Sequence, residues 1–460
     1  MHLPTDCQPL QTALKDRRRK LAEKVDFPVV LWSGIANSRN FPANTHPFRA
    51  SSHFLYFAGL PLERAAIHLE GSQLTLFLDE PPEGYALWHG EMPQRQEIAD
   101  WIGADQVFDY SALESHIQTA ATIAVQHPEI RVEQAAVLGR PVHHPTASLE
   151  LDRNLIQAIV QLRLSHDPGA LSELRKAAAV TVAAHKAGMR ATRTSQLEAG
   201  IRGAMEGVII GHNMTCSYNS IVTVHGEVLH NQQYGHPLKP GDLLLADVGA
   251  ETPLGWAADV TRTWPVSGQF SPCQREIYQI VLAAHDTCIE NIKPGVEYES
   301  IHLQAAQVIA EGLAQLGILK GRADDLVAQD AHALFFPHGV GHVLGLDVHD
   351  MEDLGDLAGY APGRQRSQRF GLGFLRLNRP LQAGMLVTIE PGFYQVPAIL
   401  NSAENRTKYK DMVNWEQLEK FSDVRGIRIE DDVWVTEAGA EILTRDLPTQ
   451  STAIEALVTD

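Results

Sequence analysis

The stretch that decides the fold is Leu243-Leu-Leu-Ala-Asp-Val-Gly-Ala-Glu-Thr-Pro-Leu-Gly-Trp-Ala-Ala-Asp-Val-Thr-Arg-Thr-Trp-Pro265. Two apolar runs of strand type flank a turn at 253–255. The first run ends at Asp247 and the second begins at Asp259, so a hairpin would place the two carboxylates side by side. Two buried anions repel unless a cation compensates them, whereas two surface aspartates on an ordinary hairpin need no such partner. Both readings are open from this stretch alone.

Three downstream stretches favour a metal site. They are His338-Gly-Val-Gly-His342, Val387-Thr-Ile-Glu390 and Gly426-Ile-Arg-Ile-Glu430. The first lacks the glutamate of the zincin motif His-Glu-x-x-His, and its glycines disfavour a long helix. A lone histidine is usually an ordinary core or surface residue, but His338, His342 and His349 lie in one short glycine-rich run. One imidazole with four carboxylates suits one or two divalent cations, Mn²⁺ foremost; the expected ligands are Asp247, Asp259, His342, Glu390 and Glu430.

Composition narrows the class of protein. The 460 residues suggest two domains, and 44% hydrophobic with 20% charged residues is a globular composition. The formal net charge of -18 argues against nucleic acid as a partner. None of the four cysteines forms a Cys-x-x-Cys pair, which argues against zinc-ribbon and thioredoxin sites. Four cysteines in so long a chain do not suggest a disulfide framework, which favours a reducing compartment. Without a signal-like N-terminus or a membrane-length apolar run, we expect a cytoplasmic protein with no membrane contact.

The expected organisation is an N-terminal domain over 1–165 and a catalytic domain over 166–460. In the first we expect a helix near 10–25, a hairpin over 65–78 with its turn at Gly71 and Ser72, and then a helix over 117–125 followed by a strand over 130–137. In the second, helices are predicted over 171–191, 195–208, 274–291 and 300–316. Such content favours an α+β fold with one antiparallel sheet covered by helices. Two irregular stretches, 351–381 and 395–425, are predicted to be long loops.

These residues resemble the pita-bread metallopeptidases, the family of methionine aminopeptidase, aminopeptidase P and prolidase. The match covers about 168–443 and keeps five motifs in the family's order. The resemblance implies a curved antiparallel sheet covered by helices, with an N-terminal creatinase-like α/β domain in front of it. It implies that Asp247 and Asp259 bind metal, that Asp259 and Glu430 bridge two ions, and that His342 and Glu390 hold one of them. His230 would be interpreted as a surface residue if it were taken alone. Together with His338 and His349 it matches the family's supporting and substrate-facing histidines. Arg428 matches an arginine of the proline-specific branch.

The proline-specific branch is favoured over methionine aminopeptidase. His349 within Gly-Leu-Asp-Val-His-Asp is similar to the extended histidine motif of that branch, and Phe48-Arg-Ala-Ser-Ser-His-Phe-Leu-Tyr-Phe57 resembles the creatinase-type domain. Arg275-Glu-Ile-Tyr-Gln-Ile-Val281 and Leu316-Gly-Ile-Leu-Lys-Gly321 resemble bacterial aminopeptidase P. The loops over 351–381 and 395–425 are longer than in that enzyme and look more like prolidase, so prolidase is the alternative. A non-catalytic pita-bread binding module is the distant alternative, marked in that class by lost ligands.

The resemblance implies a metallo-aminopeptidase that releases the N-terminal residue of a Xaa-Pro peptide by attack of a metal-bridging hydroxide. Glu390 is then a proton shuttle as well as a ligand, and His349 and His230 polarise the carbonyl or steady the oxyanion. Prolidase instead requires a cation for the free carboxylate of a dipeptide. The arginines of 351–381 could supply it, although solvated surface charge is the favoured interpretation. The N-terminal domain is expected to act as a size filter in a homo-oligomer, a dimer or tetramer.

Overall fold

The computed structural model describes residues 3–5, 7–117 and 119–460. The chain forms two compact units. The N-terminal unit is Met1–Glu173 together with Pro253–Trp256 and Met351–Ala358, and the C-terminal unit contains the remaining residues. Two short pieces from within the predicted catalytic sequence therefore pack into the N-terminal unit. The boundary between residues 165 and 166 stays a prediction.

The N-terminal unit contains a four-stranded sheet in the order β1-β4-β5-β6, in which only the β5–β6 pair is parallel. The predicted hairpin is confirmed, since Glu70 pairs with Gln73 around Gly71 and Ser72. Gly71 has a φ of +57°, which glycine adopts without strain. The strands of this unit are β1 (Val29–Trp32), β2 (Ser38–Phe41), β3 (Asn44–Thr45), β4 (Ala66–Glu70), β5 (Gln73–Phe77) and β6 (Gln106–Phe108).

One helix of this unit was predicted from the sequence, and the other described helices were not. The helix expected near 10–25 is α1. All seven residues of α2 are buried, so no amphipathic pattern marks it in the sequence. The helices are α1 (Gln8–Ala22), α2 (Ser52–Ala58), α3 (Tyr85–His89), α4 (Arg95–Ile102), α5 (Leu113–His116), α6 (Pro128–Leu138) and α7 (Glu150–Arg163).

The prediction for 117–137 was wrong. The expected strand over 130–137 is helix α6, which begins at Pro128, where proline's fixed φ favours the first turn. In the described part of 117–125 there is no helix. Instead the chain runs beside β1, with the amide of Val30 donating to the carbonyl of Ala121 at 2.9 Å. A short continuous apolar run cannot distinguish a buried extended segment from a buried helix.

The C-terminal unit has only antiparallel strand pairs. The expected single sheet is divided into short ladders, β11-β9-β8, β12-β15-β16, β13-β14 and β10-β7. The amide of Glu430 donates to the carbonyl of Thr261 at 3.0 Å, which joins the ladders around β11 and β14. The strands are β7 (Thr215–Cys216), β8 (Ile221–Thr223), β9 (Leu243–Asp247), β10 (Ala250–Glu251), β11 (Thr261–Pro265), β12 (Leu386–Ile389), β13 (Gly392–Tyr394), β14 (Gly426–Arg428), β15 (Asp431–Val435) and β16 (Ala440–Ile442).

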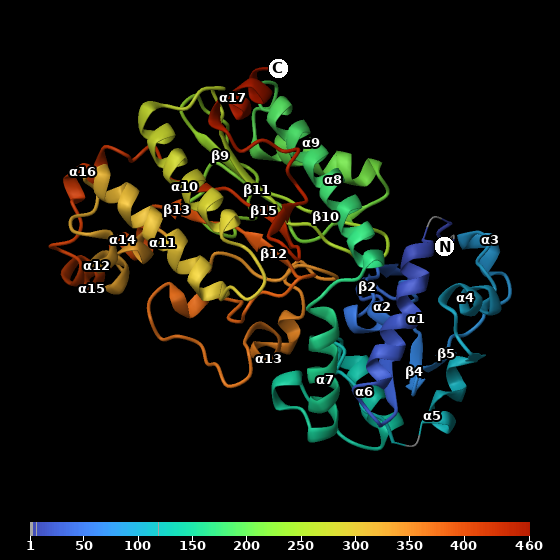
Figure 1. Cartoon of the computed structure of the whole chain (residues 1–460). Helices are drawn as coiled ribbons and strands as arrows, with labels where there is room; N and C mark the ends of the chain where they lie inside the picture. Colours follow the sequence, from blue (N-terminus) through green and yellow to red (C-terminus); the bar gives the residue numbers. More distant parts are fainter. Residues whose placement is uncertain (1–2, 6, 118) are drawn as a thin grey trace. The chain divides into compact units, whose positions relative to one another are not determined.

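The four long helices predicted for this region are confirmed. Helix α9 packs on β7 and β8, whereas α10 packs on β12, β13 and β14 and pairs with α11 (Figure 1). The two stretches predicted as loops contain short helices. The helices are α8 (Pro168–Ala191), α9 (Glu198–Gly211), α10 (Pro272–Glu290), α11 (Tyr298–Gln315), α12 (Ala323–Ala328), α13 (Asp356–Gly359), α14 (Pro397–Leu400), α15 (Ala403–Lys408), α16 (Trp415–Glu419) and α17 (Ser451–Thr459).

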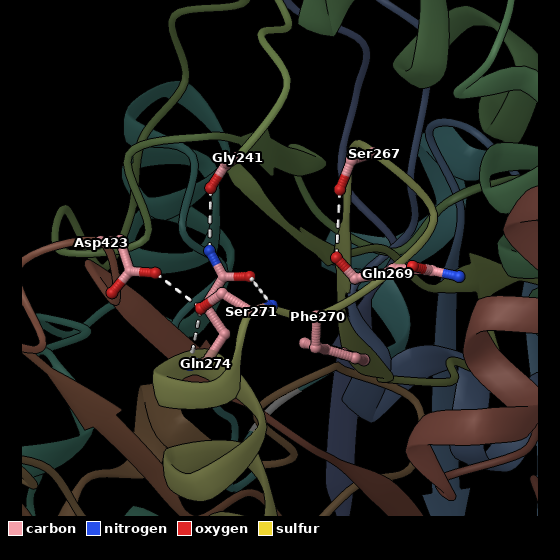
Figure 2. Close-up of a pocket in the computed structure, with 7 residues that line it drawn as sticks. All are labelled: Gly241, Ser267, Gln269, Phe270, Ser271, Gln274 and Asp423. Atoms are coloured by element: carbon pink, nitrogen blue, oxygen red, sulfur yellow. Dashed lines mark hydrogen bonds between the residues drawn. The ribbon is translucent and has the colours of Figure 1, made fainter.

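The start of α10 ties this helix to the chain before two central strands (Figure 2). Ser271 accepts from the amide of Gln274 at 3.1 Å, and the Gln274 side chain accepts from the amide of Ser271 at 3.0 Å, which forms a capping box. Gln274 also donates to the carbonyl of Gly241, just before β9, at 2.8 Å. The Ser271 hydroxyl donates to Asp423, just before β14, at 2.7 Å. The surface pocket at this point is therefore lined by groups that already bind one another.

Candidate metal centre

The first two carboxylates of the centre come from the predicted hairpin. Asp247 is the last residue of β9 and lies opposite Thr261 in the β9–β11 ladder, two residues beyond Asp259. Between them, Gly249 lies so close to the carbonyl of Ala258 that a Cβ would collide with it. Asp247 is 9% exposed and Asp259 is 5% exposed, so both are largely removed from water. The structure thus buries the two aspartates instead of leaving them on the surface.

The second two carboxylates come from the other central strands. Glu390 follows β12, and its amide donates to the carbonyl of Val340 at 2.8 Å. Glu430 lies between β14 and β15, is 1% exposed, and accepts at Oε2 from the hydroxyl of Thr261 at 2.7 Å. That threonine is the residue opposite Asp247, so the hairpin and the second pair of strands present their carboxylates to the same place.

The imidazole of the centre is held by its backbone neighbours. His342 follows Gly341, where a Cβ would collide with the carbonyl of Thr388 and the hydroxyl of Tyr298. The His342 amide donates to the hydroxyl of Thr388 at 3.1 Å, and Nδ1 donates to the carbonyl of Val343 at 3.0 Å. With Nδ1 carrying the proton, Nε2 keeps a lone pair for a metal. Nε2 lies 3.3 Å from Asp259 Oδ2 and 3.7 Å from Glu390 Oε1.

The five side chains, together with His349, form overlapping groups of possible metal ligands. Within each group the ligand atoms lie within 4.8 Å of one another. The groups share members, and every group found in the described part of the chain belongs to this one centre; they are Asp247 with Asp259 and Glu430, His342 with Glu390 and Glu430, and Asp259 with His342 and His349. Carboxylate oxygens with one imidazole suit Mn²⁺, and also Zn²⁺ or Co²⁺.

The electrostatics of the cluster also fit a cation. Burial, followed by the charge of Asp247, raises the pKa of Asp259 to about 8. Burial raises the pKa of Glu390 to about 7 despite the opposing effect of His342. Burial and the charges of Asp259, Glu390 and Asp247 raise the pKa of Glu430 well above its ordinary value. The protein's own groups therefore do not neutralise these carboxylates, and a divalent cation would do so.

Two of the three supporting histidines lie against the ligands. His338 Nδ1 donates to the carbonyl of Gly339 at 2.7 Å and lies 3.9 Å from Glu390 Oε2. Burial and the charge of Arg428 lower the pKa of His338 to about 3, so its ring is neutral. The ring of His349 packs edge-on against that of His342, with centroids 4.3 Å apart. The glycine-rich run thus brings all three of its histidines to the centre.

His230 reaches the same place on a separate loop. Its imidazole is exposed, unlike the buried ligands. Burial of part of the ring and the charge of Arg428 lower its pKa, while the charge of Asp247 raises it. The charges of Arg428, Asp247 and His349 all act on this pKa, so His230 lies within electrostatic range of the ligand cluster.

Arg428 is the hub of a hydrogen-bond network beside the ligands. It donates to Asp247 Oδ2 at 2.5 Å, to the hydroxyl of Thr261 at 2.9 Å and to the hydroxyl of Tyr394 at 3.0 Å. The Tyr394 hydroxyl in turn donates to Nε2 of His338 (2.9 Å apart). Asp247 also accepts from the hydroxyl of Tyr218. Of the four carboxylates, the guanidinium hydrogen-bonds to Asp247, while its charge also acts to lower the pKa values of Asp259, Glu390 and Glu430.

Sequence reasoning identified Arg428 but missed the three hydroxyl residues around it, Tyr218, Thr261 and Tyr394. Thr261 lies two residues after Asp259 and Tyr394 four after Glu390, so both were within reach of the motifs. A β-strand places residues i and i+2 on one face, which is the signal that could have found Thr261. Tyr218 offers no such signal, because it comes from the chain before β8.

The arginines of the 351–381 stretch differ in their partners. Arg364 pairs with Glu297 at 2.6 Å, and Arg369 pairs with Asp330 at 2.7 Å. Arg366 donates to the carbonyl of Leu375 at 3.1 Å, and Arg379 to that of Tyr360 at 2.9 Å. The charge of Arg376, after burial and the charge of Arg428, contributes to lowering the pKa values of His230 and His338. Arg376 therefore lies close enough to the centre to act on its histidines.

Two family profiles match the chain. Residues 172–437 match metallopeptidase family M24, and residues 14–127 match the N-terminal domain of aminopeptidase P. The first match contains all nine residues discussed above as ligands or supporting groups. In the part of the chain that the structure describes, no helix combines the length and the hydropathy needed to cross a bilayer.

Relatives and solved structures extend the match to both ends of the chain. The Xaa-Pro aminopeptidase of Escherichia coli K12 is 31% identical over 431 residues, which cover 90% of this chain and 89% of that protein. The human Xaa-Pro dipeptidase is 29% identical over 439 residues, covering 93% of this chain and 88% of that protein. The structure of aminopeptidase PepP from Pseudomonas aeruginosa superposes with a TM-score of 0.79 at 28% identity and covers 98% of both chains.

Proposed function

We propose that this chain, which belongs to metallopeptidase family M24, is a Xaa-Pro aminopeptidase that hydrolyses the Xaa-Pro bond with two divalent cations. The observation that carries the proposal is the convergence of five ligands on one place, four of them buried and Glu390 half-buried. We assign Asp259 and Glu430 as bridging ligands, with Asp247 completing one ion site and His342 and Glu390 the other. Shared carboxylates offset the repulsion between adjacent cations. Mn²⁺ is the proposed native ion.

The bound cations would lower the pKa of a water molecule and polarise the scissile carbonyl. The remaining steps fall to this chain's own side chains. Glu390 Oε2, which faces His338 at 3.9 Å, would accept a proton from the attacking water molecule and deliver it to the leaving proline nitrogen. His349 and His230 donate hydrogen bonds to the carbonyl oxygen as negative charge develops on it. Arg428 holds Asp247 in the orientation required of a ligand.

The catalytic roles are tested by His349→Ala. This variant should keep its metal and lose turnover by about 10²- to 10³-fold, the usual effect of removing one oxyanion donor. Elemental analysis and release of the N-terminal residue from a Xaa-Pro peptide measure both properties. His212→Ala is a matched control, because His212 is exposed at the end of α9. Wild-type turnover in the metal-replete His349→Ala protein would refute the assignment.

Preference for dipeptides is the second candidate function, and Arg376 favours it. A prolidase needs a cation for the free carboxylate just beyond proline, and Arg376 is the loop arginine whose charge acts on His230 and His338. Comparing a Xaa-Pro dipeptide with the same sequence extended by two residues decides between the candidates. Cleavage of the longer peptide supports the aminopeptidase, and cleavage of the dipeptide alone supports the prolidase.

Arg376→Gln sharpens that comparison. If the guanidinium binds a free carboxylate, KM for the dipeptide should rise by about tenfold or more while KM for the longer peptide changes little. Arg364→Gln is the matched control, because its guanidinium is occupied by Glu297.

The same measurements test the non-catalytic alternative. Bound metal together with hydrolysis of a Xaa-Pro peptide would exclude a pure binding module. A homo-oligomer and a cytoplasmic location stay predictions.

A further inference from the structure

The loop Val224–His236 has to hold an exposed catalytic group in place. It begins where β8 ends and carries His230 near its middle. Within the described residues the His230 ring makes no hydrogen bond. An exposed side chain has little packing of its own, so the position of this imidazole depends on the backbone of its loop.

The two ends of this loop are bound by one carboxylate, that of Glu198. At one end, Glu198 Oε1 accepts from the amide of Val224 at 2.8 Å and from the hydroxyl of Thr223 at 3.0 Å. At the other end, Oε2 accepts from Nδ1 of His236 at 2.8 Å and from its amide at 3.3 Å. Each oxygen therefore serves one end of the loop, and the carboxylate closes the loop at its base.

The contact continues from the base of the loop to the neighbour of His230. The Thr223 hydroxyl that donates to Glu198 also accepts from Nδ2 of Asn231 at 3.0 Å and from the amide of His225 at 2.9 Å. Asn231 is 8% exposed and directly follows His230. Two hydrogen bonds through one hydroxyl thus connect Glu198 to Asn231, the residue beside the catalytic imidazole, and a third holds the amide of His225.

The surroundings of Glu198 show that these hydrogen bonds satisfy a fully buried side chain. Its side chain is 0% exposed, and a buried carboxylate is costly unless it is fully hydrogen-bonded. Glu198 is also the first residue of α9, where the helix dipole favours a negative charge. The α9 amides of Glu198 and Ala199 donate to the carbonyls of His236 and Tyr234, at 3.2 and 3.0 Å. The helix start and its acidic side chain therefore bind the same loop.

We propose that Glu198 is a positioning residue for the peptidase reaction, which fixes His230 by closing the Val224–His236 loop at both ends. The inference rests on the proposed role of His230. The proposal distinguishes a side chain that contacts the substrate from one that only positions such a side chain. His230 touches the reacting carbonyl, whereas Glu198 acts only through His230 and lies outside the ligand groups.

Glu198→Gln tests the proposal in the full-length, metal-loaded protein. One oxygen becomes an amide donor, so the hydrogen bonds at one end of the loop are lost while side-chain volume is kept. We expect kcat on a Xaa-Pro peptide to fall by about 10- to 100-fold, as for other outer hydrogen-bond partners, with metal content unchanged. Thr223→Val, which removes the shared hydroxyl with little change in shape, should act in the same direction and serves if Glu198→Gln folds poorly.

The decisive measurement is the double-mutant cycle with His230→Ala. If Glu198 acts only through His230, adding Glu198→Gln to His230→Ala should lower kcat by less than about twofold. Asp152→Asn is the control for removing a buried carboxylate, since Asp152 is 3% exposed and binds Arg140 in the N-terminal unit. It should leave kcat unchanged.

Three results would overturn the inference. An equal loss of kcat from Glu198→Gln with and without His230 would show a general structural effect. Loss of bound metal in Glu198→Gln would place the effect at the ligands. Unchanged kcat in both Glu198→Gln and Thr223→Val would show that the loop needs no such closure. His230→Ala with wild-type turnover would instead refute the proposed role of His230, and the inference with it.

Discussion

Glu430 and Asp431 are consecutive buried carboxylates with opposite surroundings. They are 1% and 2% exposed. Burial and the charges of three other carboxylates raise the pKa of Glu430 well above its ordinary value. Burial also acts to raise the pKa of Asp431, but the charge of Arg262 and the hydrogen bond from His285 outweigh it and lower that pKa. Equal burial therefore leaves one group short of positive charge and the other fully compensated.

The alternation of a β-strand explains the difference. Successive side chains point to opposite faces, so Glu430 faces the ligand cluster and Asp431 faces away from it. Asp431 binds Arg262 at 2.8 Å, His285 at 3.1 Å and the hydroxyl of Thr444 at 2.6 Å. Arg262 in turn donates to the carbonyl of Glu430 at 2.5 Å, so the compensated side fixes the backbone of the uncompensated one.

The comparison shows that a buried charge indicates a functional site when the protein supplies too few groups of opposite charge to neutralise it. Arg262 is 0% exposed and finds an anion and several carbonyls within its own unit. In the cluster around Glu430, the hydrogen bond from Arg428 goes to the carboxylate of Asp247. A site for a cation is therefore visible as a deficit of positive charge in the folded protein.

The largest expected effect comes from changing the uncompensated side. Asp259→Asn removes a ligand shared by two of the three ligand groups. We expect loss of metal and turnover reduced to background, because an amide cannot supply the negative charge that the cations share. Elemental analysis and peptide hydrolysis measure this. Full metal occupancy in the variant would contradict the bridging role.

Changing the compensated side should instead reduce stability. Asp431→Asn leaves the buried charge of Arg262 without its anion, which typically costs about 3–5 kcal/mol. Chemical denaturation measures the free energy of unfolding, and the fraction that remains folded should still bind metal. If Asp431→Asn lost metal with unchanged stability, the two neighbouring carboxylates would not differ in the way proposed.

The smallest expected effect is a pH dependence that metal reverses. Carboxylates with raised pKa values bind more protons in the folded state than in the unfolded state. Without metal, their contribution to the stability of the fold is therefore present below about pH 4 and is lost as the pH rises. This stabilising contribution is lost as the pH rises through the pKa of each group, which is about 7 for Glu390 and about 8 for Asp259. Metal binding requires the deprotonated ligands, and a ligand at 100 times its Kd adds about 2.7 kcal/mol. The increase in Tm on adding Mn²⁺ to chelator-treated protein should therefore grow from pH 5 to pH 8. An increase that is constant across this range would contradict the proposed charge deficit.

The sequence was sufficient for the parts of the fold with local signals. Asp167 and Pro168 predicted the start of α8, and in the structure Asp167 accepts from the amide of Ala170 at 2.9 Å. The hairpin of β9 and β11 was visible because apolar runs flank a turn. Helix α2 was not visible, since a helix buried on all sides has no amphipathic period.

The same limit applies to the site. The motifs indicated the five ligands, and the resemblance to the pita-bread metallopeptidases added His230, His338, His349 and Arg428. The structure brings the five ligands together, with His338, His349 and Arg428 against them. The hydroxyls of Tyr218 and Tyr394 and the closure of a loop by Glu198 were not predictable. Their contacts join residues at least 25 positions apart, and hydrogen bonds of that range leave no local pattern. Nor could spacing show which loop arginine acts on the site histidines.

The central claim is that the cations held by this cluster carry out the hydrolysis of a Xaa-Pro bond. Its most direct test is a Mn²⁺ titration of chelator-treated protein that records bound metal and release of the N-terminal residue from a Xaa-Pro peptide in the same samples. The account predicts negligible release without metal and activity that rises with occupancy up to two ions per chain. Full activity in metal-free protein, or two bound ions without any release, would contradict it.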